Sequence, residues 1–153
     1  MLALVVAAGA FGLLLLSSAL LFSRGGSYEP KAEDLPLRSM TVVPFVVRDD
    51  PSLAPAASGF AADVARRLGT AMPQARVVAG TGDAETRFRL EGVATGAGAD
   101  MEVTLQVIDN RDGREVESAR VSVPRAKLGE AGALLAPVAH RLLNAAMMRA
   151  AAD

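Results

Sequence analysis

An uncharged apolar run at the amino terminus sets the first limit on how this chain can fold. From Leu2 to Phe22 no side chain is charged, and only Ser17 and Ser18 are more polar than glycine. As a helix rising about 1.5 Å per residue, the run would reach roughly 31 Å, the thickness of a bilayer's hydrocarbon core. Residues 1–22 are therefore expected to form a transmembrane anchor.

A cleaved signal peptide is the other interpretation of this run. Such a peptide normally has a basic amino-terminal region, a shorter apolar stretch and a small-x-small cleavage site. No Lys or Arg precedes the run here, and the segment from Ala19 to Ser23 is a poor cleavage site. We therefore expect the apolar segment to be retained.

Small side chains recur along one face of the expected transmembrane helix. Small residues let such helices pack closely against one another, so this stripe is a candidate contact with another membrane protein. The alternative is that alanine is simply common in any apolar helix. The candidate packing residues are Ala3, Ala7, Ala10 and Ser17.

Composition excludes several classes of function. The 153 residues include no cysteine, which removes disulfides, thiol catalysis, cysteine metal sites and a lipidated-cysteine anchor. Sixteen basic and 17 acidic residues give a formal net charge of -1. A nucleic-acid-binding protein usually shows a basic excess or patch, and this sequence shows neither.

The apolar run is followed by a linker and then by one domain. Residues 23–38 are expected to be the linker, because Gly25, Gly26 and Pro30 punctuate them and no apolar period appears. Residues 39–153 are expected to form a single α/β (α+β) domain. Its length is enough to close a modest core without a metal or a disulfide.

The domain is expected to open with a strand, a helix and a second strand. Met40 to Val47 is rich in β-branched residues, Ala57 to Ala71 has a helical apolar period, and Arg76 to Ala79 is a short strand. This order predicts a right-handed parallel β-α-β unit. The side chains expected on the buried face of the helix are Phe60, Val64 and Leu68.

Three further strands are expected to form an antiparallel meander with one covered face. Arg87 to Glu91 alternates cleanly and reaches Gly92, where a bulge is expected because the phase changes. Met101 to Val107 alternates, and Glu115 to Val123 is the last strand. The side chains expected on the covered face are Leu90, Val103 and Leu105.

A carboxyl-terminal helix is expected to close the fold. It is expected to run from about Leu128 to Arg149, with an apolar stripe from Leu128 to Ala145. Pro137 lies inside this stretch, and a proline there should kink the helix or divide it into two pieces.

Four segments of the expected domain occur in the order of a known module. Ser39 to Phe45 is a strand that ends in Pro-Phe, and Gly59 to Asp63 leads into a helix. Phe88 to Val93 contains Leu-Glu-Gly, and Val103 to Asp109 is a strand followed by a turn with Gly113. Together they resemble the TolB amino-terminal-domain-like family.

This resemblance covers about residues 39–149 and implies an α/β module that is generally non-catalytic and often periplasmic. The family usually has a second helix before its Leu-Glu-Gly strand. Here only Gly80 to Thr86 separates the two strands, which leaves no room for such a helix. One face of the sheet is therefore expected to be uncovered and open to a partner.

Two signals disagree about the side of the membrane on which the domain lies. Arg24, Lys31 and Arg38 follow the apolar run and no basic residue precedes it, which by the positive-inside rule favours a cytoplasmic domain. The family resemblance favours the periplasm. We follow the resemblance and expect a single-pass inner-membrane protein with a periplasmic domain.

None of the candidate catalytic or metal-binding motifs is complete. His140 is the only histidine, and because neither cysteine nor suitably spaced acids lie nearby, it is expected to be a solvated helix residue. Gly80 to Gly82 lacks the Lys-Ser/Thr of a phosphate-binding loop, and Asp109 to Gly113 lacks the late glutamate of a calcium loop. Asp49 and Asp50 have no companion base. We expect no enzyme activity, no cofactor and no metal.

The sequence therefore predicts a non-catalytic, membrane-anchored accessory or scaffold subunit of a bacterial envelope or membrane-protein complex. Its expected partners are other membrane proteins and the lipid bilayer, without nucleic acid or metal. The alternative is a membrane-tethered sensor domain that binds a small ligand in the groove left by the missing helix.

Overall fold

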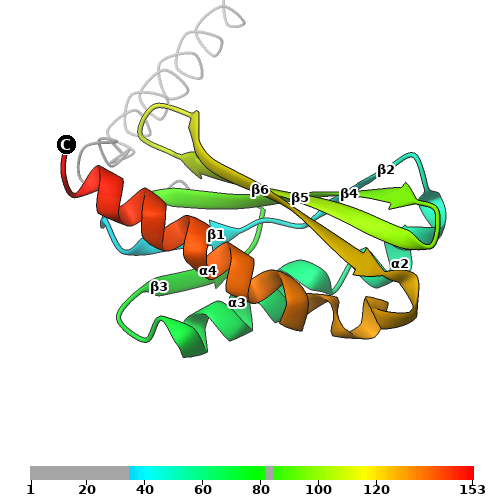
Figure 1. Cartoon of the computed structure of the whole chain (residues 1–153). Helices are drawn as coiled ribbons and strands as arrows, with labels where there is room; N and C mark the ends of the chain where they lie inside the picture. The colour runs from blue at the N-terminus through cyan, green and yellow to red at the C-terminus, as the bar shows by residue number, and fades with distance from the viewer. Residues whose placement is uncertain (1–34, 82–84) are drawn as a thin grey trace, which may run out of the picture.

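The computed structural model describes residues 35–81 and 85–153 (Figure 1). Eleven helical and strand elements make up these residues. In chain order they are β1 (Ser39–Val42), β2 (Val46–Arg48), the 3-10 helix η3 (Pro51–Leu53), α2 (Ala54–Ala57), α3 (Phe60–Ala71), β3 (Arg76–Ala79), β4 (Phe88–Ala97), β5 (Asp100–Asp109), β6 (Arg114–Pro124), the 3-10 helix η4 (Arg125–Glu130) and α4 (Ala131–Ala150).

The strands form one mixed sheet in the order β3-β1-β4-β5-β6, with β2 also paired to β4. β1 runs parallel to both β3 and β4, whereas β4, β5 and β6 are antiparallel neighbours. β1 and β2 lie on either side of Pro44, in the β-rich run from Met40 to Val47. Proline has no backbone N–H to donate to a neighbouring strand, which accounts for the break.

Both long helices lie on the same face of the sheet (Figure 1). α3 connects the parallel strands β1 and β3, and α4 packs against α3 and β6. The core fills the space between these helices and the sheet. It includes all six side chains that the sequence placed there, Phe60, Val64, Leu68, Leu90, Val103 and Leu105.

The bulge expected at Gly92 is wrong. β4 pairs with β5 without a register shift from Phe88 to Ala97, and Gly92 lies opposite Leu105. The residue is buried because its backbone lies against the ring of Phe45. The register shift occurs instead between β5 and β6, at Val107 and Ile108.

α4 is a single helix with Pro137 inside it, so this proline does not divide it. The helix contains 20 residues and begins after η4 rather than at Leu128. At the other end of the domain, Leu35 is buried and Leu37 packs against the core. The last residues of the expected linker are thus part of the folded unit.

No helix of the described residues is both long and apolar enough to cross a membrane. α4 has sufficient length, but His140, Arg141 and Asn144 interrupt its apolar residues. The predicted architecture with an amino-terminal transmembrane helix is therefore corrected to an α+β fold with a mixed sheet and two principal helices. The predicted single-pass inner-membrane location with a periplasmic domain depended on that helix and is corrected with it.

The segment on which these two predictions rested, residues 1–22, lies outside the described residues. The same is true of the candidate packing stripe, Ala3, Ala7, Ala10 and Ser17.

Candidate interaction surfaces

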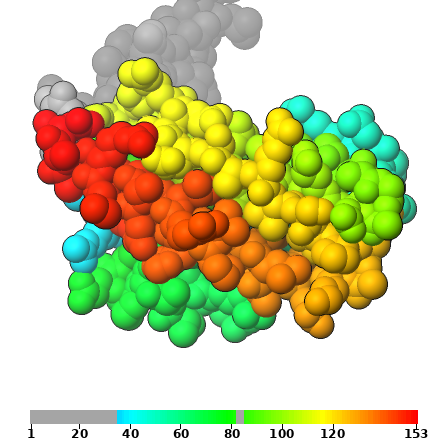
Figure 2. All heavy atoms as spheres, in the orientation of Figure 1, coloured from blue at the N-terminus to red at the C-terminus, as the bar shows by residue number. Residues whose placement is uncertain are grey.

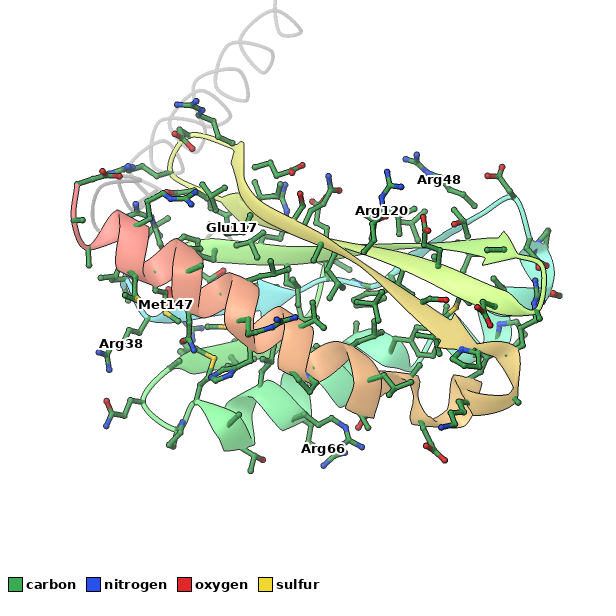
Figure 3. The ribbon with its side chains drawn as sticks, viewed as in Figure 1. Arg38, Arg48, Arg66, Glu117, Arg120 and Met147 are labelled. Carbon is green, nitrogen blue, oxygen red and sulfur yellow. The ribbon has the colours of Figure 1, made fainter. Side chains whose placement is uncertain are left out.

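The first candidate surface is the sheet face that points away from α3 and α4, called here the open face. Side chains along β4, β5 and β6 alternate between the core and this face. Between β3 and β4 the described residues contain no helix that could cover it. Figure 3 shows Arg120 and Arg48 pointing to this side, with Arg66 on the opposite side of the molecule. The register places on the open face Arg89, Glu91, Val93, Thr95, Glu102, Thr104, Gln106, Ser118, Arg120 and Ser122.

Most charges on the open face are paired within it. Arg89 Nε lies 2.7 Å from Glu91 Oε1, and Arg120 Nη1 lies 3.8 Å from Glu102 Oε1. Gln106 Nε2 donates to Glu115 Oε2 at 2.6 Å. Exposed pairs of this kind contribute little to folding stability, so their main effect is to make the face polar and nearly balanced in charge.

The outer strand β6 is protected against pairing with another strand. Val116 lies at the register shift, and its carbonyl accepts a hydrogen bond of 2.8 Å from Arg149 Nη1. Arg149 Nη2 also lies 2.7 Å from Glu117 Oε1, an ion pair whose geometry falls short of a hydrogen bond. Bulges and charged side chains both discourage strand addition at a sheet edge. The open face, rather than the β6 edge, is the better candidate for contact with a partner.

The second candidate surface is a groove on the helical side, called here the terminal groove. Figure 2 shows this side, with α4 in orange to red lying beside α3 in green. The groove encloses 480 Å³ where the end of α3 and the following loop meet the last turns of α4. Its walls are Leu37, Arg38, Ala71, Met72, Pro73, Gln74, Ala75, His140, Asn144, Met147, Met148 and Ala151.

A second hollow of 330 Å³ lies between α3 and α4 and shares Ala71 and His140 with the terminal groove. Three methionines line the groove, from the buried Met72 to the exposed Met148. Methionine is flexible and polarisable, which suits a surface that adapts to an apolar ligand. The terminal groove is therefore predominantly apolar.

The polar groups of the terminal groove are few. Arg38 Nη1 donates to Gln74 Oε1 at 2.7 Å. His140 Nε2 lies 3.1 Å from Asn144 Nδ2. His140, expected to be a solvated helix residue, is half-buried and lines both hollows.

A buried ion pair fixes the turn that superficially suggested a calcium loop. Arg87 donates to both carboxylate oxygens of Asp109, at 2.8 and 2.9 Å, and the Arg111 N–H donates to Asp109 at 2.9 Å. Burial alone would raise the pKa of Asp109, but these hydrogen bonds outweigh it and hold the pKa below its ordinary value. Asp109 is therefore a structural anchor, and among the described residues no group of three His, Asp or Glu could hold a metal ion.

Asp50 is also occupied structurally rather than chemically. It accepts a hydrogen bond from the Ser52 N–H at 3.1 Å and forms an ion pair with Arg125. The hydrogen bonds from Ser52 and Arg125 hold the pKa of Asp50 below its ordinary value. Asp49, its neighbour, occupies the turn with a φ of 64°.

No family model matches this chain, and no curated protein matches it. Solved structures do. PelC from Paraburkholderia phytofirmans, solved as a dodecamer, is 22% identical over 69% of this chain and 88% of that chain, with a TM-score of 0.51. The chain shares its fold with PelC.

Two further structures are similar at lower scores. TolB from Acinetobacter baumannii is 16% identical over 69% of this chain and 28% of that chain, with a TM-score of 0.46. Lipoprotein GNA1162 from Neisseria meningitidis is 19% identical over 70% of this chain and 97% of that chain, with a TM-score of 0.47. The structural neighbours thus include TolB, the protein whose family the sequence resembles.

The sequence anticipated one of the two surfaces and missed the other. The short connection from Gly80 to Thr86 signalled a sheet face without its second helix. The terminal groove was not predicted, because its walls come from three segments that are far apart in the sequence. One of these segments contains Arg38. A signal was present in the adjacent Met147 and Met148, two large apolar side chains near the end of an amphipathic helix.

Proposed function

We propose that this chain is a non-catalytic accessory or scaffold subunit of the bacterial envelope, and that its domain binds other protein chains through the open face. The observation that carries the proposal is the open face itself. Three long antiparallel strands present a broad polar surface there, while both principal helices occupy the opposite side (Figure 1).

The chemistry of the open face fits a reversible protein interface. Such interfaces are about as polar as ordinary protein surface and contain bridging waters and scattered hydrogen bonds. Thr104 and Gln106 lie on the central strand of the three and offer hydrogen-bonding groups. The flanking cations Arg89 and Arg120 are offset by carboxylates, which favours a protein partner over the phosphate backbone of a nucleic acid.

Two further considerations support the setting and the kind of partner. The motif resemblance to the TolB amino-terminal modules supports a place in the bacterial envelope. PelC, which has the same fold, was solved as a dodecamer. We therefore include further copies of this chain among the proposed partners, beside other envelope proteins.

Purification of the native complex tests this proposal through a matched pair of substitutions. Thr104→Trp places a large ring in the middle of the open face, and Thr70→Trp places the same ring on the exposed side of α3. Tryptophan is well tolerated in strands, so the first variant should still fold. We expect Thr104→Trp to lose the partner that the unaltered chain retains, and Thr70→Trp to keep it. Equal recovery of the partner with both variants would remove the open face as the binding surface.

A sensor that binds a small ligand is the second candidate function. The observation that favours it is the terminal groove, whose 480 Å³ is within the range of about 300–1,000 Å³ typical of ligand pockets. The groove lies on the helical side rather than in the place of the missing helix. The two functions use opposite sides of the domain, so one does not exclude the other.

A further inference from the structure

We infer that the terminal groove is a binding site for a free long-chain carboxylate, that is, a fatty acid. The acyl chain would lie along the methionines, and the carboxylate would bind Arg38. This inference goes beyond the scaffold role and does not depend on it, because the terminal groove and the open face are on opposite sides of the domain.

Apolar side chains make up most of the wall of the site. Met72, Met147 and Met148 line the 480 Å³ groove together with small aliphatic side chains. The 330 Å³ hollow between α3 and α4 lies beside the groove and shares Ala71 and His140 with it, and its wall also includes Arg67. A flexible acyl chain matches this methionine-lined groove better than a compact polar metabolite does, because the groove offers few hydrogen-bonding groups.

Among the described residues that line the terminal groove, Arg38 is the one permanent cation, and it defines the head group. Arg38 is exposed and donates one hydrogen bond, to the neutral Gln74, and none of the described carboxylates pairs with it. A guanidinium has five N–H donors in a planar fork that matches a carboxylate, so Arg38 can accept a ligand without losing an existing ion pair. Figure 3 shows Arg38 and Met147 at the same end of the molecule.

Other arginines of the domain are not placed for this task. Arg66 and Arg67 pair with Asp63, and Arg87 pairs with Asp109. Arg48 is exposed, but it lines neither of the two hollows. Arg38 thus combines a guanidinium that pairs with none of the described carboxylates with an apolar groove beside it, which is the combination that an anionic amphiphile requires.

Titration of the full-length chain with dodecanoate, below its micelle concentration, tests the inference. With ¹³C-labelled methionine methyl groups, we expect shifts at Met72, Met147 and Met148, while the fully buried Met101 serves as an internal control. Dodecyltrimethylammonium has a similar chain and the opposite charge, so it should bind at least tenfold more weakly. Equal binding of the two amphiphiles, or shifts confined to methionines elsewhere, would overturn the inference.

Two charge-matched variants isolate the role of Arg38. Arg38→Gln should weaken dodecanoate binding about tenfold, as expected for the loss of a charge-assisted hydrogen bond. Arg48→Gln removes the same charge from β2 and should leave the affinity unchanged. Unchanged affinity in Arg38→Gln, or an equal loss in both variants, would contradict the site. The inference would also be contradicted if dodecanoate did not bind and the groove instead bound a second copy of this chain or a helix of another protein.

Discussion

The ring of Phe45 lies against the backbone of Gly92, so close that a Cβ added to Gly92 would be 2.5 Å from Phe45 Cδ2. The same ring makes an edge contact with Phe60 of α3, with ring centroids 6.2 Å apart. The Pro-Phe and Leu-Glu-Gly segments, recognised separately in the sequence, are therefore two sides of one contact. That contact joins the turn between β1 and β2 to the middle of β4 and to the start of α3.

Gly92→Ala should destabilise the fold, because the new methyl group would collide with Phe45. Overpacking of a filled core costs about 1–3 kcal/mol, and chemical denaturation of the full-length chain measures this loss. Phe45→Leu should recover part of it in the double variant. Gly69→Ala is the control, since nothing lies within 4 Å of its Cβ and alanine favours a helix. A Gly92→Ala variant as stable as the parent would show that the ring moves aside freely.

Leu90 and Leu105 test the covered face of the antiparallel strands. Both side chains are fully buried, so replacement of either by alanine should cost about 2–5 kcal/mol in the free energy of unfolding. Thr104→Ala, on the open face of the same strand as Leu105, should cost less than about 0.5 kcal/mol. Equal losses at Leu105 and Thr104 would contradict the assignment of the two faces.

Some of this architecture is local enough to be predicted from the sequence. Alternation from Met101 to Val107 depends only on the two-residue period of a strand, and it correctly separates Val103 and Leu105 from Thr104. The helical stripe of Phe60, Val64 and Leu68 is local in the same way.

Other features depend on contacts between distant residues, and these were misjudged. Gly92 was interpreted as a bulge, but a glycine is required there by Phe45, which lies in the turn between β1 and β2. His140 was interpreted as solvated. The groove that it lines forms only where the loop after α3 meets α4, so the sequence of α4 alone does not reveal it. The open face was anticipated from a short connection, whereas the pairing of its charges depends on register, which no single strand specifies.

Asp109 makes the stability of the domain dependent on pH. The folded-state pKa of Asp109 is lowered from its ordinary 3.8, so its contribution is complete above that pH and is lost as the pH falls through the folded-state pKa. Asp109→Asn should cost about 3–5 kcal/mol near neutrality, because it leaves Arg87 without its counter-charge at 8% side-chain exposure. The difference in the free energy of unfolding between the parent chain and Asp109→Asn should become smaller in acid.

The control for Asp109 is Glu91→Gln, which removes a partly exposed ion pair with Arg89 and should cost less than about 1 kcal/mol. Denaturation curves collected over a range of pH values compare the three proteins. A loss in Asp109→Asn that is the same at every pH would show that the carboxylate charge is not the cause.

Gly132 lets the first turn of α4 approach α3. A Cβ on Gly132 would collide with the carboxylate of Asp63, so Gly132→Ala should force the helices apart and destabilise the fold by about 1–3 kcal/mol. Asp63→Ala in the same chain should relieve the collision, and the double variant should be more stable than an additive sum predicts. Gly129→Ala, where nothing lies within 4 Å, is the matched control. Additive losses would indicate that Gly132 matters for another reason.

The most direct test of the central claim is photocrosslinking in the cells that produce the protein. A benzoylphenylalanine at position Thr104 would report on the open face, and the same group at Thr70 would report on the exposed side of α3. The account predicts a discrete adduct with one partner chain, or with a second copy, from Thr104 and little adduct from Thr70. An adduct from Thr70 alone would contradict the claim that the open face is where this domain binds.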